Sequence, residues 1–94
     1  MLIKRAHGTV NLEYLKCGGT YIHGIEVDPE WRNKGYGSRM MEFALKKASL
    51  PVYLLASSEL GGDVDRLVKW YKGFGFKKKR GSDVGYNYNM VLWE

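Results

Sequence analysis

The spacing of apolar residues changes once along the chain, and this change restricts what the chain can fold into. Before residue 28 apolar and polar side chains alternate, as Val10, Leu12 and Tyr14 do with their neighbours, which is the period of a half-buried strand. From residue 35 to 48 apolar residues recur instead at helical spacing, so that one side is apolar and the other charged. The sequence therefore predicts strands followed by a helix that packs on them.

Three strands are predicted ahead of this helix, over residues 2–6, 9–14 and 20–27. Gly18-Gly19 lies between the second and third strands. A glycine pair supplies the positive φ angles that a tight hairpin turn needs. We therefore expect the second and third strands to be antiparallel neighbours, with the first strand at the edge.

The third predicted strand contains an irregularity in its apolar pattern. Ile22 is out of phase with Ile25 and Val27, so a regular strand cannot turn all three toward one core. One extra residue in the ladder restores the phase, and glycine makes such a bulge easiest. We predict a β-bulge near Gly24-Ile25-Glu26.

The remaining segments complete a single sheet. Residues 51–56 are apolar without alternation, as in a central strand that is covered on both sides. A second helix with one apolar side is predicted over residues 63–72. Residues 76–80 and 86–93 are predicted to be two closing strands joined by a Gly81-Ser82-Asp83 turn. The sequence thus predicts one α/β domain over all 94 residues, a mixed, mainly antiparallel sheet with helices on its faces.

Composition excludes several classes of protein. Hydrophobic residues make up 45% of the chain, which favours a packed core over disorder. No apolar run approaches the roughly 20 residues needed to cross a bilayer, and the N-terminus lacks the apolar stretch of a signal peptide. Cys17 has no second cysteine for a disulfide or a thiolate metal cluster. We therefore expect a cytoplasmic protein without a membrane partner.

The positive charge lies in one part of the chain. Basic and acidic residues balance through Asp65, so the formal excess of +5 belongs to the residues from Arg66 onward. No acidic residue stands between Arg66 and Arg80. Such a segment attracts an anion, which here means nucleic acid, a phosphorylated cofactor or an acidic partner, or else it is a solvated face that keeps the protein soluble.

Residues 32–38 form a glycine-containing junction between the third strand and the first helix. Glycines at such a junction let the backbone approach a ligand, and the helix N-terminus points unpaired N–H groups at it, which suits phosphate. A P-loop is excluded because Lys34 precedes Gly35, and a dinucleotide fingerprint because Met40 replaces the third glycine. The junction therefore predicts a phosphate site of another type, or only a tight connection.

Two segments in the expected order resemble motifs of the GNAT superfamily of N-acetyltransferases. Residues 27–37, VDPEWRNKGYG, resemble the main motif, whose pyrophosphate loop Arg/Gln-x-x-Gly-x-Gly/Ala follows a bulged strand. Residues 71–76, YKGFGF, are similar to the second motif, a helical Tyr followed by Gly-Phe. The resemblance covers residues 21–76 and implies a short member that lacks the N-terminal strand and two helices of larger members.

The resemblance implies that the chain binds acetyl-CoA and uses no metal. The backbone amides of residues 33–38 would cradle the pyrophosphate, and the backbone of Val27 would meet the pantetheine and the acetyl carbonyl. Residues 54–57 would form the opposite wall. Arg32 and Lys34 would add charge near the phosphates or stay solvated. The implied cofactor-binding residues are Val27, Arg32, Asn33, Lys34, Gly35, Tyr36, Gly37 and Ser38.

Acetyl transfer to an amine needs a neutral nucleophile, a stabilised oxyanion and a proton for the departing thiolate. Tyr71 matches the family tyrosine that often supplies this proton, although it also lies on the apolar side of its helix. Three candidates for the general base stay open. They are His23 on the bulged strand, Glu26 at the bulge, and Glu59 or a chain of waters.

The chain also departs from the family pattern. Val64 and Leu67 stand where many members have Asn and Ala, so a cofactor contact is either lost or moved to Asp63. The elements that often build the acceptor site have no room. The resemblance therefore implies an N-acetyltransferase that acts, by direct attack in a ternary complex, on a protein lysine or N-terminal amine, with an acidic surface on the acceptor protein.

Two other functions stay open beside acetyl transfer. The missing acceptor elements are also consistent with a catalytically silent module that binds CoA. Residues 77–80, KKKR, with Tyr86 and Tyr88, are consistent with a nucleic-acid-binding domain, although no recognised nucleic-acid motif accompanies them. The sequence leaves the acceptor, the formation of a homo-oligomer and a bacterial or phage host open.

Overall fold

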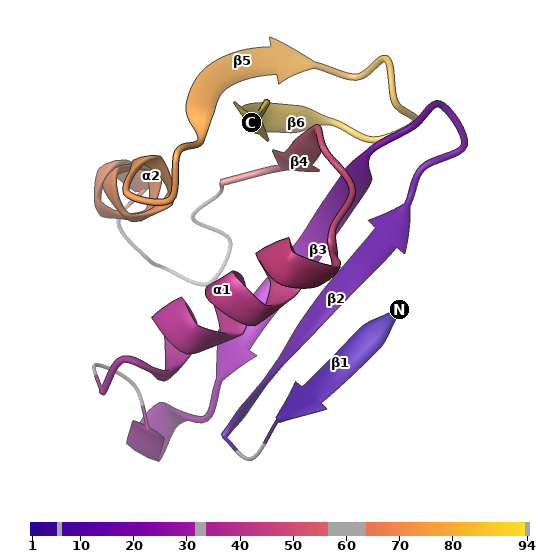
Figure 1. Cartoon of the computed structure of the whole chain (residues 1–94). Coiled ribbons are helices and arrows are strands. Elements are labelled where there is room, and N and C mark those ends of the chain that lie inside the picture. Colours follow the sequence, from indigo (N-terminus) through magenta and orange to yellow (C-terminus); the bar gives the residue numbers. More distant parts are fainter. Residues whose placement is uncertain (6, 32–33, 57–63, 94) are drawn as a thin grey trace.

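The structure is a computed structural model that describes residues 1–5, 7–31, 34–56 and 64–93. Its described strands form one six-stranded sheet in the order β1-β2-β3-β4-β6-β5 (Figure 1). The elements follow the predicted order: β1 (Leu2–Arg5), β2 (Gly8–Tyr14), β3 (Thr20–Val27), the 3-10 helix η1 (Pro29–Trp31), α1 (Tyr36–Lys47), β4 (Val52–Leu54), α2 (Val64–Lys72), β5 (Lys77–Gly81) and β6 (Tyr88–Leu92).

The sheet is mixed and mainly antiparallel, as predicted. Only β3 and β4 run parallel among its neighbouring pairs, and α1 is the crossover between them. The β2–β3 hairpin turns through Gly18 and Gly19, which have φ angles of 95° and 91°. The predicted glycine turn is thus confirmed. The β5–β6 turn is longer than the predicted Gly81-Ser82-Asp83, because Gly81 ends β5 and Tyr88 begins β6.

The predicted bulge in β3 is confirmed, but its position differs. Asn11 pairs with Gly24 and Leu12 with Ile22, so His23 is the extra residue. The bulge therefore precedes Ile25 instead of including it. Its effect is the one inferred from the phase of the apolar residues, since Ile22 lies in the core and Ile25 packs against it.

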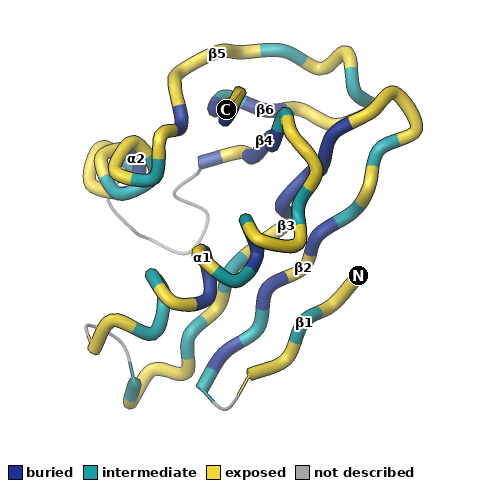
Figure 2. The backbone as a smooth tube through the Cα atoms, in the orientation of Figure 1, coloured by how far each residue is buried: buried dark blue, intermediate teal, exposed yellow. Residues whose placement is uncertain are grey.

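Both helices pack on the same face of the sheet. The sequence predicted helices on the faces of the sheet but not that both would share one. Met40, Met41 and Ala44 of α1 and Val68 of α2 are buried in one cluster with side chains from the central strands. Figure 2 shows that the buried backbone follows β2, β3, β4 and β6 beneath the helices. The strand residues of this cluster are Val10, Leu12, Ile22, Val52, Leu54, Met90 and Leu92.

The opposite face, called the helix-free face below, is covered by tyrosines of the sheet itself. Tyr21, Tyr53 and Tyr88 form a second buried cluster with Val91. The Tyr21 hydroxyl donates to the backbone oxygen of Asn87 at 2.6 Å. Tyr53 is therefore buried, as predicted for a central strand, although tyrosine rings and no described helix cover it on this side.

One buried polar side chain ties the hairpin to the crossover. Thr20 is fully buried, and its hydroxyl donates to the backbone oxygen of Ser49 at 3.0 Å and accepts from the backbone N–H of Ser49 at 2.8 Å. Both hydrogen bonds fix the start of β3 beside the start of β4.

Across the described ranges, no helix is long and apolar enough to span a bilayer.

Candidate functional site

The sheet opens between β3 and β4. The two strands pair only from Thr20 to Ile22 on one side and from Val52 to Leu54 on the other. β3 then continues to Val27 paired with β2 alone, and it runs away from β4 (Figure 1). The opening begins at His23, the residue that the bulge adds. Backbone groups on both sides of the opening are thereby left without a neighbouring strand.

The β4 side of the opening is held by Asn89 of β6. Beyond the end of β4, the backbone N–H of Ala56 donates to Asn89 Oδ1 at 2.8 Å, and Asn89 Nδ2 donates to the backbone oxygen of Ala56 at 2.8 Å. This amide thus replaces two ladder hydrogen bonds after regular pairing stops. The predicted wall over residues 54–57 is accordingly fixed to β6 as far as Ala56, and residue 57 lies outside the described ranges.

The N-terminus of α1 lies beside the end of β3. Gly35 is the N-cap residue, with φ 84°, and among the described residues no side chain caps the helix. The carbonyl of Gly35 accepts the first helical bond from Arg39 at 3.1 Å. A Cβ on Gly35 would meet nothing within 4 Å, so the loop borders open space. The N–H groups of the first turn are therefore available to an anion, as a phosphate site requires.

Three elements meet at Gly37. A Cβ at this position would lie 3.6 Å from Trp70 Cζ2 and 3.7 Å from Val27 Cγ2. The end of β3, the first turn of α1 and the helix α2 therefore converge beside the opening. The structure brings the side chain of Val27 close to Gly37 of the glycine loop. Ser38 is half-buried in the same turn.

An aromatic cluster that the sequence did not reveal braces this loop. His7 stacks on Trp31 with ring centroids 3.7 Å apart, and its centroid is 4.7 Å from that of Tyr36. Lys34 places its ammonium 5.0 Å from the Trp31 ring. The backbone N–H of Asp28 also donates to the oxygen of His7 at 2.9 Å. Nothing in the local sequence around His7 indicates that it stacks on a residue 24 positions away.

Tyr71 lies on the helix side of the sheet. It is half-buried against the core, with its ring centroid 5.2 Å from Trp70 and 5.9 Å from Phe76. Burial raises the pKa of its hydroxyl above the ordinary value. The hydroxyl is protonated at neutral pH, as that of any tyrosine is, and can therefore donate a proton.

His23 lies on the helix-free face at the start of the opening. Its Nε2 is 3.3 Å from Glu13 Oε1. The Tyr86 hydroxyl donates to both oxygens of the same carboxylate, at 2.8 and 3.0 Å. The rings of Tyr21 and Tyr86 each lie 4.8 Å from the His23 ring, measured between centroids. His23 and Tyr71 thus lie on opposite faces of the sheet.

The Tyr86 hydrogen bond is the main cause of a lowered pKa at Glu13, and contact with His23 adds to it. Sequence reasoning missed Glu13, and it considered Tyr86 only as a nucleic-acid contact and not as a partner of His23. The alternation in β2 places Glu13 on the face of Tyr21, which is a usable signal. No local pattern indicates the contact with Tyr86, which is 73 positions away.

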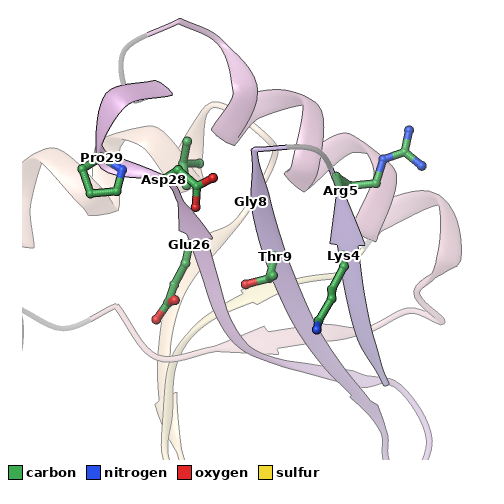
Figure 3. A pocket seen from close by; sticks show the side chains of 8 residues that line it. Lys4, Arg5, Gly8, Thr9, Glu26, Asp28 and Pro29 are labelled. Atoms are coloured by element: carbon green, nitrogen blue, oxygen red, sulfur yellow. The ribbon is translucent and has the colours of Figure 1, made fainter.

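Glu26 lies on β3 as His23 does, but nearer the end of the strand. It pairs with Thr9, which pairs with Lys4, and the three side chains line a cavity of about 260 Å³ (Figure 3). A larger groove of about 550 Å³ lies between β1 and α1, and its lining includes Tyr36 and Arg39. Neither hollow is lined by His23 or Tyr71.

Several predicted positions lie outside the described residues. They are Arg32, Asn33, Glu59 and Asp63. Val64 and Leu67, which depart from the family pattern, are half-buried against the helix-side core. Their apolar side chains therefore pack α2 onto the sheet.

The basic residues 77–80 are exposed along β5, an edge strand of the sheet. Lys79 lies 4.7 Å from the centre of the Trp93 ring. Tyr88, which the nucleic-acid reading used as a stacking residue, is buried, and its hydroxyl donates to Asp83 at 2.7 Å. Tyr86 is held by Glu13. Tyr88 is therefore inaccessible to a base, whereas the ring of Tyr86 is exposed and packs against Tyr21 and His23.

Comparisons with known proteins agree with this arrangement. The family model described as acetyltransferase (GNAT) domain matches residues 2–78. A protein from Bacteroides thetaiotaomicron that is assigned to the GNAT family of acetyltransferases has a similar structure, with a TM-score of 0.71 at 22% identity over 99% of this chain and 60% of that one. The structure of Ard1 from Thermoplasma volcanium is also similar. Its TM-score is 0.63 at 23% identity, and the match covers 94% of this chain and 64% of that one.

The chain thus spans less than two thirds of the length of either structure, and the likeness to them shows the fold. No curated protein matches the chain.

Proposed function

The chain belongs to the acetyltransferase (GNAT) domain family, and from this premise we propose that it transfers an acetyl group from acetyl-CoA to a primary amine. The acceptor is a protein lysine or an N-terminal amine, which attacks directly in a ternary complex. One observation carries the proposal. The sheet opens between β3 and β4 from His23 onward, and the N-terminus of α1 lies beside the end of β3. This arrangement supports a channel for the thioester next to a site for the phosphates.

The residues present fit acetyl-CoA. The backbone N–H groups of Tyr36, Gly37 and Ser38 would hold the pyrophosphate, with the exposed ammonium of Lys34 adding charge. The pantetheine would pass between the backbone of Val27 and the wall that ends at Ala56. Gly35 supports this fit because its left-handed backbone and the open space around it leave room for a ligand.

The placement of His23 and Tyr71 on opposite faces supports direct attack. Acetyl-CoA supplies the acetyl group as a thioester, so that a C–N bond forms while the C–S bond breaks and the sulfur leaves as a thiolate. His23 takes one proton from the ammonium acceptor before attack and passes it to solvent. The Tyr71 hydroxyl gives its proton to the leaving sulfur and regains one from the nitrogen that becomes the amide. The sum is an amide, a thiol and one proton in solvent.

The acceptor site is open on the helix-free face. The described part of the chain places no helix over His23, and an enclosed pocket for a small molecule is accordingly missing there. The exposed cations of residues 77–80 lie along one sheet edge and attract acidic residues near the acceptor amine. A protein with an acidic surface is therefore the acceptor that this face favours.

Release of free thiol tests the proposal. The protein is mixed with acetyl-CoA and with panels of N-terminal peptides, lysine peptides and polyamines, and mass spectrometry identifies the acetylated product. We expect thiol release above background with at least one peptide amine. Binding of acetyl-CoA without transfer to any panel would contradict the enzyme and would identify the catalytically silent module instead.

A further inference from the structure

The side chains that contact His23 have no role in the proposed reaction, although they form a network. Three elements contribute to it: Glu13 from β2, His23 and Tyr21 from β3, and Tyr86 from the turn before β6. A carboxylate that accepts hydrogen bonds from a neighbouring hydroxyl and an imidazole is a built arrangement. The network stands at the start of the opening.

From this geometry we propose that Glu13 is the positioning residue for His23, and that Tyr86 holds the Glu13 carboxylate in place. This inference rests on the proposed acetyl transfer, in which His23 accepts the proton of the acceptor amine. Glu13 fixes the orientation of the imidazole through Nε2 and stabilises it when it carries the proton. Nδ1 is then the nitrogen left for the acceptor, and among the described residues none bonds to it.

The two hydrogen bonds from Tyr86 explain why the carboxylate is suited to this task. They stabilise the charged form of Glu13, so its charge persists at pH values where an isolated carboxylate begins to take up protons. The ring of Tyr86 also contacts the His23 ring edge to face, at an interplanar angle of 89°. The side chains of Glu13, His23 and Tyr86 therefore limit one another's orientation.

The solvent exposure of the His23–Glu13 pair determines how large an effect we expect from removing the charge. The side chains of His23 and Glu13 are 29% and 45% exposed, so solvent screens their attraction. Pairs of this kind contribute little, and we expect Glu13→Gln to lower kcat/KM by about two- to fivefold on the pH plateau above the acidic limb, where the imidazole is neutral and only its orientation is lost.

The test follows His23 in two ways. Ring resonances of His23 are titrated by NMR in the free protein, and the pH profile of kcat/KM is measured with acetyl-CoA and a peptide amine found by the thiol assay. Glu13→Gln is compared with Glu42→Gln, the same change on the exposed surface of α1. Tyr86→Phe keeps the ring and removes only the hydroxyl that binds Glu13.

The inference predicts that Glu13→Gln moves both the His23 titration and the acidic limb to lower pH, while Glu42→Gln matches the wild type. Tyr86→Phe moves both in the same direction but by less, because Glu13 keeps its charge over most of this range and loses only the hydroxyl that holds it in place. An unchanged His23 titration in Glu13→Gln, with an active wild type, overturns the inference alone. A shifted titration with an unmoved acidic limb overturns the positioning role. An inactive wild type overturns the proposed function, and the positioning role with it.

Discussion

The packing of Tyr71 holds its hydroxyl in one place, because contacts with Trp70 and Phe76 restrict the ring. The hydroxyl is protonated at neutral pH, as that of any tyrosine is, and burial raises its pKa further. Tyr71→Phe preserves the ring contacts and removes only the hydroxyl. We expect kcat to fall by about a hundredfold, because general acid catalysis contributes at least this much, while acetyl-CoA affinity changes little.

Steady-state kinetics together with calorimetric titration of acetyl-CoA separate the two quantities for Tyr71→Phe. A variant that turns over at the wild-type rate would remove Tyr71 from the reaction and leave it as a core residue.

At the scale of elements, the start of α1 depends on the backbone of Gly35. Its φ of 84° strains any residue that has a Cβ, although no atom would contact that Cβ. Gly85, in the β5–β6 turn, is a matched control with φ 93° and equally open surroundings. Alanine at either position should cost about 1–2 kcal/mol of stability.

Only Gly35→Ala should weaken acetyl-CoA, by about tenfold, the equivalent of one hydrogen bond to a charged group. Chemical denaturation measures the stability of both variants, and calorimetric titration measures their affinity. Equal loss of affinity in Gly35→Ala and Gly85→Ala would mean that general destabilisation, and not the loop, controls binding.

The elements were predictable because each depends on local spacing. The alternation around Val10 and Leu12, the positive φ angles at Gly18 and Gly19, and the apolar side of residues 36–47 all correspond to observed structure. The exact position of the bulge was not predictable. The phase of the apolar residues requires one extra residue in the strand but does not say which, and in the structure Gly24 stays paired with Asn11 while the preceding residue is the extra one.

The site was predictable only in part for a similar reason. The loop at Gly35 and Gly37 carries its own sequence signature, and in the structure it lies close to Val27. The partners of His23 come from long-range pairing of the sheet. No local pattern joins Glu13 to Tyr86, so the network required the complete fold.

At the scale of the whole molecule, tyrosine hydroxyls link stability to alkaline pH. The hydrogen bond to Asp83 raises the pKa of Tyr88 to about 12, whereas the unfolded residue titrates near 10. Between these values the unfolded chain loses the proton first, so the unfolded state binds fewer protons and stability falls as pH rises. The contribution of Tyr88 is complete below about pH 10 and is lost through about pH 12.

Tyr88→Phe should therefore show a shallower loss of thermal stability between pH 10 and 12 than the wild type, although it starts from a lower Tm. Scanning calorimetry over this range provides the comparison. Parallel curves for the two proteins would show that the bond from Tyr88 to Asp83 has no part in alkaline unfolding.

The central claim is that acetyl-CoA binds in the opening between β3 and β4, with its phosphates at the start of α1. Amide shift mapping by NMR on the labelled protein during titration with acetyl-CoA tests it most directly. The account predicts the largest shifts at Val27, Gly35, Gly37 and Ala56. Shifts confined to the groove between β1 and α1, or to the basic edge strand β5, would contradict it.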